Sequence, residues 1–403
     1  KATLTTKTLL EFTQLTLQYV NQSIQSNKRE DGLYHAYNLI SFKGENVSVR
    51  NLYEMLEGQV AVLSSGYLSV KESLVLLDAL KSSHLFRADQ YSYLLYPDRQ
   101  LPRFVEKNDI PEKRIKASEL LHQLIVDKNN SILKKDINGK YHFNGAFRNA
   151  AVLDEALEKL DKQTYGSLIE ANKQDILDIY EEVFDHQSFT GRSGTFYGYE
   201  GLGSIYWHMV SKLLLAVQES YFKGIHENAD AVTMGKIKDH YYEIKAGIGL
   251  YKSPELYGAF PTDAYSHTPA NSGAKQPGLT GQVKEDIISR FGELGIHIHQ
   301  GKITFNPALL NSEEILKQQE SFMYFDLSGT QKLVELKPKQ LGFTFCQVPF
   351  IYSFNQKENI RVIFSDGERK EFEGSILPAE ISLKIFARSG EIERIEYESQ
   401  TII

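Results

Sequence analysis

The chain has 403 residues and a mass of 45.9 kDa, a length typical of two or three domains or of one large domain with a smaller one. Hydrophobic residues make up 41% and charged residues 24%, which excludes wholesale disorder and fibrous repeats. The net charge of −7 disfavours a general nucleic-acid binder, and the single cysteine, Cys346, excludes a disulfide framework and a cysteine-based zinc site.

The first 250 residues carry helical patterns. We expect helices over 5–26, 51–66 and 69–83 in the N-terminal part. No proline occurs between residues 112 and 253, and helices are expected there over 114–127, 147–161 and 233–247. Ile169, Ile176, Tyr180 and Val183 recur on one face of a further helix. The segment 204–222 is apolar nearly all round, which predicts an inner helix covered by the others.

The period changes near residue 296, where alternating patterns begin. Strands over 361–364 and 370–372 flank a Ser-Asp-Gly turn, and strands over 383–387 and 391–397 flank a Ser-Gly turn. Helices followed by strands predict a mainly α fold with a β appendage. We therefore expect an α/α toroid (barrel) of helical hairpins over 1–295 and an all-β, sandwich-like domain over 296–403. An α-solenoid is the alternative, but no fixed-period repeat supports it.

The segment 184–203 joins two expected helices and is rich in glycine and aromatic residues. Five glycines lie within 191–203. Glycine lets a backbone approach a ligand closely, and aromatic faces can stack on sugar rings. Because this loop leads into the inner helix, we expect a pocket here, with Asp185 and Glu200 as candidate catalytic carboxylates. The candidate substrate-binding residues are Arg192, Tyr197, Tyr199, Trp207 and His208. A flexible connector, with Asp185 as a helix-end charge, is the alternative.

The segment 258–282 has almost no bulky aliphatic residue and many hydrogen-bonding groups. Asp263 is its candidate catalytic carboxylate. Residues 280–281 precede an expected helix over 282–294, whose first N–H groups can hold an anion. The candidate binding residues are Tyr265, His267, Lys275, Gln276 and Thr280. Disorder would explain the small residues of this segment but not the tyrosine, histidine and glutamine among them.

A third segment, 86–97, combines three tyrosines with Arg87 and Asp89, and it is either a sugar-contacting wall or a structural ion pair. His297 and His299 share one strand face, for which an exposed strand is favoured over a metal site. The sequence contains none of the motifs for dinucleotides, nucleoside triphosphates, the serine-hydrolase elbow or zinc peptidases. We therefore expect neither a metal nor a cofactor.

The order of these segments resembles the catalytic region of the cellobiose phosphorylase family and its α/α-toroid glycoside hydrolase relatives, over about residues 170–310. A helix ending near Asp185, a glycine-rich loop and a buried helix are followed by a loop ending in Leu-Thr-Gly and by a β unit. The resemblance implies that Asp185 is the general acid, although residues 183–187 read Val-Phe-Asp-His-Gln where the family has Gly-Asp-Trp-Asn-Asp. It also implies that Thr280 and Gly281 lie near phosphate.

The family's N-terminal β-sandwich has no counterpart in a chain that begins at Lys1. We therefore expect a longer natural chain or a partner chain that supplies this domain. No apolar run reaches the roughly 18–20 residues of a membrane span. The sequence leaves the location open between cytoplasm and periplasm.

Two mechanisms fit these residues. An inverting hydrolase needs an acid and a base about 6.5–9.5 Å apart, whereas a phosphorylase needs one acid and a phosphate site. Three carboxylates are available, and the anion site offered by Ser266, His267, Lys275 and Thr280 lacks an arginine. We therefore predict an inverting glycoside hydrolase acting on an oligosaccharide or polysaccharide. The alternatives are a phosphorylase that uses inorganic phosphate and a non-catalytic glycan-binding protein. A lyase using Tyr265 and His267 ranks lowest.

Overall fold

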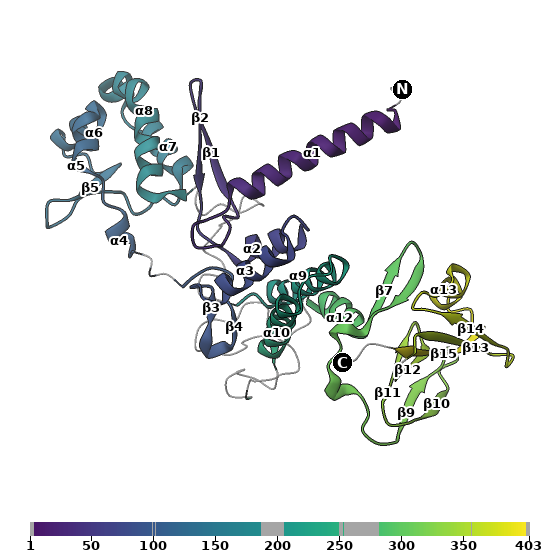
Figure 1. The fold of residues 1–403 in the computed structure, drawn as a ribbon. Coiled ribbons are helices and arrows are strands. Elements are labelled where there is room, and N and C mark those ends of the chain that lie inside the picture. Colours follow the sequence, from purple (N-terminus) through teal and green to yellow (C-terminus); the bar gives the residue numbers. More distant parts are fainter. Residues whose placement is uncertain are drawn as a thin grey trace.

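The computed structural model describes residues 4–98, 100, 102–186, 205–249, 253, 282–355 and 357–399 (Figure 1). Within this part of the chain, buried apolar side chains form three separate clusters. The central core draws on residues 33–96 and 205–248 together with Leu309. The small helical core lies within 110–184, and the C-terminal core lies within 294–397.

The central core is built mainly from helices that the sequence pattern anticipated. Its elements are α1 (Thr6–Ser26), β1 (Asn38–Lys43), β2 (Asn46–Asn51), α2 (Leu56–Ser64), α3 (Val70–Lys81), β3 (Phe86–Arg87), η1 (Ala88–Gln90), β4 (Ser92–Tyr93), α9 (Trp207–His226), α10 (Ala231–Ile248) and α12 (Gln282–Glu293). A capping box between Ser69 and Glu72 fixes the start of α3. The apolar α9 packs against α2, α3, α10 and α12, so it is the inner helix of this layer.

Polar contacts between α9, α10 and α12 show in which direction each of these three long helices runs. Near their starts, His208 of α9 meets Glu285 of α12, and further along Gln218 of α9 donates to the carbonyl oxygen of Ser289. α9 and α12 therefore run side by side in the same direction. α10 follows α9 after a four-residue connection and returns along it, so that Tyr241 lies beside Gln218.

The small helical core belongs to a unit inserted between β4 and α9. Its elements are α4 (Phe104–Lys107), α5 (Glu112–Ala117), α6 (Glu119–Val126), β5 (Leu133–Lys135), β6 (Tyr141–Phe143), α7 (Ala150–Glu158) and α8 (Lys162–Phe184). The single helix expected over 114–127 is two helices, α5 and α6. Ser118 separates them because its hydroxyl caps α6 through the N–H of Leu121 while it also binds Asn172.

The C-terminal core contains a five-stranded sheet in the order β11-β12-β15-β13-β14, in which β12 and β15 are parallel. The elements are β7 (Ile296–His299), β8 (Lys302–Phe305), η3 (Pro307–Leu309), η4 (Ser312–Glu314), β9 (Glu320–Phe325), β10 (Gln331–Leu336), β11 (Gln340–Phe345), β12 (Val348–Phe354), β13 (Asn359–Phe364), β14 (Arg369–Glu373), α13 (Ala379–Phe386) and β15 (Ile392–Ser399). The hairpin predicted around residues 365–367 is confirmed by the β13–β14 pairing.

The strand predicted over 383–387 is wrong, because these residues form the end of α13 and continue past it. Ile381 and Ile385 are both buried, and their spacing of four residues is helical. Pro378 precedes the helix and Glu380 lies in its first turn, both of which favour a helix start. The α/α toroid over 1–295 and the sandwich-like form of 296–403 stay predictions.

No helix in the described part of the chain has the length and apolar character needed to cross a membrane.

Candidate functional site

All three segments singled out in the sequence border one end of the α9–α10–α12 layer, which we call the loop end. The first segment leads into α9, and the second lies between the end of α10 and the start of α12. The third contacts the last turn of α10, because a Cβ on Gly247 would lie 2.0 Å from the carbonyl oxygen of Tyr91. Since α9 and α12 start at this end and α10 finishes there, both attachment points of the second loop lie close to the C-terminal attachment point of the first.

A buried histidine–carboxylate pair joins the starts of α9 and α12. His208 Nε2 lies 3.2 Å from Glu285 Oε1, and Tyr206 Oη lies 3.4 Å from His208 Nδ1. Glu285 is only 4% exposed, and among the described residues its Oε2 has no hydrogen-bond partner. The next residue, Asp286, differs from Glu285 because its side chain is exposed to solvent. Partial desolvation of its carboxyl raises its pKa, and the charge of Glu285 adds to this, although a contact with Ser211 acts in the opposite direction. A carboxyl that keeps its proton to higher pH has the property required of a general acid.

The Arg87–Asp89 pair of the third segment is a structural ion pair. Arg87 is 8% exposed, and its Nε and Nη2 lie 2.9 Å and 3.0 Å from the two carboxylate oxygens of Asp89. Such a bidentate geometry engages both carboxylate oxygens of Asp89. Of the two interpretations left open by the sequence, the geometry favours the ion pair.

Asp185 lies at the end of α8, where its backbone adopts the left-handed conformation with φ 52°. Arg50 of β2 holds its carboxylate through two contacts, of 2.7 Å and 3.3 Å. A guanidinium stabilises the ionised form of a carboxylate, whereas a general acid has to carry a proton. The contact therefore favours a positioning or electrostatic role for Asp185 over the acid role that the resemblance implied.

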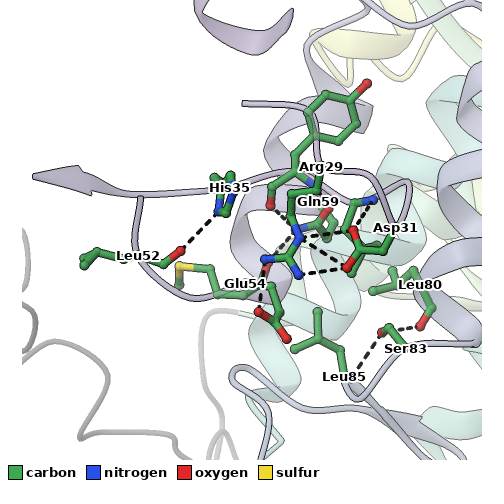
Figure 2. A network of polar contacts seen from close by, with 12 residues as sticks. Arg29, Asp31, His35, Leu52, Glu54, Gln59, Leu80, Ser83 and Leu85 are labelled. Atoms are coloured by element: carbon green, nitrogen blue, oxygen red, sulfur yellow. Dashed lines mark hydrogen bonds and ion pairs between the residues drawn. The ribbon is translucent and has the colours of Figure 1, made fainter. Parts of the chain in front are cut away.

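The β1–β2 hairpin that carries Arg50 is held by a polar network at its base (Figure 2). Arg29 Nε and Nη2 bind Asp31 at 3.0 Å and 2.8 Å, and Nη1 binds Glu54 at 3.1 Å. His35 Nδ1 lies 3.1 Å from the carbonyl oxygen of Leu52, across the two chain segments that enter and leave the hairpin. These groups engage one another, so the network serves to fix the hairpin.

A second part of this network connects the same turn to α2. Gln59 is fully buried and makes three hydrogen bonds. Its side chain accepts from the N–H of Tyr34 at 2.9 Å and donates to the carbonyl oxygens of Tyr34 and Met55 at 2.8 Å and 3.0 Å. Because all its polar atoms are satisfied, Gln59 is a structural residue that anchors the hairpin base on α2.

Most of the sequence-predicted site residues lie outside the described residues: Arg192, Tyr197, Tyr199, Glu200, Asp263, Tyr265, Ser266, His267, Lys275, Gln276 and Thr280. Of the others, Trp207 is 2% exposed and packs in the central core. His297 lies against the ring of Phe222, with centroids 4.3 Å apart, while His299 is exposed. No group of three or more metal-ligating side chains occurs within the described part of the chain.

Sequence reasoning missed Glu285, Asp286 and Arg50. Acidic residues in the first turn of a helix are common because they complement the helix dipole, so Glu285 and Asp286 carried no functional signal. Their significance comes from contacts that are distant in sequence: Glu285 lies 77 residues from His208, and Arg50 lies 135 residues from Asp185.

Comparison with known families gives one finding for this chain. Residues 101–187 match the model described as GH149 phosphorylase insertion domain 2. The matched range encloses the small helical core, which lies within 110–184. A comparison with curated proteins finds no match.

The match supports a relationship to glycoside phosphorylases and indicates a carbohydrate-active enzyme. The matched range includes Asp185, which therefore lies in the part of the chain that is similar to an insertion domain. The resemblance of residues 170–310 to a cellobiose phosphorylase catalytic region stays a prediction.

Proposed function

We propose that this chain acts as a glycoside phosphorylase, which cleaves a glycosidic bond of an oligosaccharide or polysaccharide with inorganic phosphate. The observation that carries the proposal is the similarity of residues 101–187 to an insertion domain of GH149 phosphorylases. The sequence alone favoured an inverting hydrolase and kept phosphorolysis as the alternative. The family match favours that alternative.

The chemistry needs two features, a protonated carboxyl and an anion site. A phosphate oxygen attacks the anomeric carbon, the bond from that carbon to the glycosidic oxygen breaks, and the departing oxygen takes a proton from the acid. Asp286 suits the acid because its partly desolvated carboxyl has a raised pKa while its side chain stays accessible from solvent. The first N–H groups of α12, a 12-residue helix, have no partner within the helix itself and therefore suit the anion. Both features belong to the loop end, which makes it the proposed substrate site.

The test is incubation with a panel of α- and β-glucans, with and without phosphate. Release of sugar phosphate only when phosphate is present is the expected result. Free sugar without phosphate would favour the inverting hydrolase, and sugar binding without any product would favour a glycan-binding protein. Either outcome would refute phosphorolysis.

A matched pair of variants tests the acid. Asp286→Asn should lower the phosphorolysis rate by at least about 100-fold, because proton transfer by a positioned acid contributes about 10²–10⁴-fold. Asp239→Asn, on the exposed surface of α10, makes the same chemical change away from the loop end and should leave the rate unchanged. Equal rates for the two variants would exclude Asp286 as the acid without excluding phosphorolysis.

A further inference from the structure

The C-terminal unit carries a polar groove of about 530 Å³ on one face of its five-stranded sheet. The described residues that line it belong to β10, β11, β12, β13 and β15, together with Lys337, and none of them belongs to the α9–α10–α12 layer (Figure 1). The groove is therefore separate from the loop end. Its volume lies within the range of about 300–1,000 Å³ that small-molecule sites occupy.

The alternation of side chains along the strands places a row of polar groups on this face. Tyr352 of β12 is buried in the C-terminal core, so Ser353, one residue further on, faces the groove. The register of the sheet places Ser353 between Gln340 of β11 and Glu398 of β15. Glu398 in turn pairs with Asn359 of β13. Because adjacent strands lie about 4.7–4.9 Å apart, neighbouring members of this row can contact one ligand together.

Other side chains on this face hold one another in place. Glu396 accepts hydrogen bonds from Arg361 Nη1 at 3.1 Å and from Arg394 Nε at 2.9 Å. Gln340 Nε2 donates to Ser353 Oγ at 2.9 Å. These groups are fixed before a ligand arrives, so its binding costs little side-chain entropy.

Two half-buried side chains beside this network have no partner. Among the described residues, neither the amide of Asn359 nor the carboxylate of Glu398 makes a hydrogen bond or an ion pair. Arg394 engages Glu396 through Nε alone, which leaves its two terminal amino groups as further donors. Donors and acceptors therefore lie side by side, and this arrangement suits hydroxyl groups, because each hydroxyl both donates and accepts.

The charge of the groove favours a neutral ligand. Its described lining contains three carboxylates and three cations, namely Glu335, Glu396, Glu398, Lys337, Arg361 and Arg394. These charges balance, whereas a nucleic acid or another polyanion is attracted by an excess of cations. Ile351 also lines the groove and is 5% exposed, and it offers an apolar contact to the C–H groups of a sugar ring.

We propose that this groove is a second carbohydrate site, which binds a neutral oligosaccharide through Glu398, Asn359 and Arg394. The choice of a carbohydrate among neutral, hydroxyl-rich ligands rests on the proposed function. A site away from the loop end holds a long glucan on the enzyme and raises the effective concentration of its other segments. Since the contacts are mainly hydrogen bonds, each of which adds little net affinity, we expect a dissociation constant on the order of 1 mM.

A fluorescent label beside the groove tests whether a glycan binds there. Leu333 lines the groove and is 63% exposed, whereas Leu383 of α13, outside the described lining, is 65% exposed. In a Cys346→Ser background, which removes the natural cysteine, Leu333→Cys and Leu383→Cys each carry an environment-sensitive fluorophore. The chain is titrated with hexasaccharides prepared from starch and from a mixed-linkage β-glucan.

With at least one of these hexasaccharides, the fluorescence of the label at position 333 should change saturably, and that of the label at position 383 should not. No change at position 333 with either glycan, or equal changes at both positions, would overturn the proposal.

A matched pair of variants tests the role of Glu398. Glu398→Ala removes two unpaired acceptors and should raise the dissociation constant reported by the label at least about tenfold. Glu373→Ala makes the same change on β14, next to Asn359 in the same row but outside the described lining, and should change that constant less than about twofold. Neither carboxylate has a partner among the described residues, so the melting temperatures of both variants should match that of the parent chain. Equal dissociation constants for the two variants would exclude this site.

The same variant separates this proposal from the proposed function. Glu398→Ala should raise the KM for a polysaccharide at least about threefold and leave kcat unchanged, because the groove holds the glucan without touching the reacting bond. A saturable response at position 333 without any phosphorolysis would support the groove and refute the proposed function. Phosphorolysis without a response at position 333 would do the reverse.

Discussion

Replacing Glu293 with glutamine is expected to destabilise the central core by about 3 kcal/mol. Glu293 is 1% exposed and accepts hydrogen bonds from Tyr241 at 2.6 Å and from Lys245 and Arg290 at 2.7 Å. Breaking a buried pair of this kind costs about 3–5 kcal/mol, because the remaining charges lose their counter-charge. We expect the lower part of this range, since Arg290 keeps its second partner, Glu314, and Lys245 is 40% exposed to water.

The same residue predicts a pH dependence. Burial opposes ionisation of Glu293, but the hydrogen bonds from Lys245, Tyr241 and Arg290 outweigh it and lower its pKa below the ordinary value of 4.5. Because the pKa is lowered in the folded state, the stabilisation is complete above pH 4.5 and is lost as the pH falls towards the folded-state value. The difference between the parent chain and Glu293→Gln should therefore shrink on acidification.

Trp207 makes this measurable, because it is the single tryptophan of the chain and is buried in the same core. Its fluorescence during urea unfolding, at about pH 7 and about pH 4, gives the free energy of unfolding of the central core. The control is Glu314→Gln, which removes only the half-exposed partner of Arg290 and should cost less than about 1 kcal/mol. A loss below about 1 kcal/mol for Glu293→Gln at neutral pH, or an equal loss at both pH values, would refute this reasoning.

Three further substitutions test the packing. Gly292→Ala should destabilise the central core by about 1–3 kcal/mol, because the new Cβ would lie 2.2 Å from Gln218 Oε1 and would displace this side chain from its hydrogen bond to Ser289. A neutral effect in the same tryptophan assay would show that the Gln218 side chain can move aside at no cost. Ser69→Ala should cost about 1 kcal/mol through loss of the α3 capping box, and an unchanged urea midpoint would contradict this. Ile385→Ala should cost about 2–5 kcal/mol in calorimetry of the C-terminal transition, and an unchanged transition would argue against a buried α13.

Much of the secondary structure follows from the sequence, since it depends on local patterns. The helix expected over 233–247 is α10, and the largely apolar segment 204–222 forms most of the inner helix α9. The error at 383–387 arose because Leu-Lys-Ile-Phe-Ala fits an alternating pattern as well as a helical one. The buried Ile381, just before this segment, decides between them, and its distance of four residues from Ile385 is helical.

The division into cores was harder to predict. Helical patterns continue throughout residues 1–295, and they therefore predict one helical domain. Among the described residues, those of 110–184 bury their apolar side chains among themselves, a grouping that these patterns do not indicate. Periodicity reports which face of a helix is buried, but it does not report against which other helix that face packs. The prolines at 97, 102 and 111, close to the start of the small helical core, are the boundary signal in the sequence.

The contacts at the candidate site were also beyond prediction from the sequence. Composition located the long loops, yet the contacts at the ends of the first one join residues that are remote in the chain: Arg50 holds Asp185 before it, and Glu285 holds His208 after it. The first contact is exposed and contributes little to stability, whereas the second is buried. The Arg50–Asp185 contact, which involves the small helical unit, is therefore the weaker of the two. This contact joins the small helical unit to the β1–β2 hairpin, whose base is held by the Arg29–Glu54 pair and by the hydrogen bond between Tyr34 and Gln59 of α2.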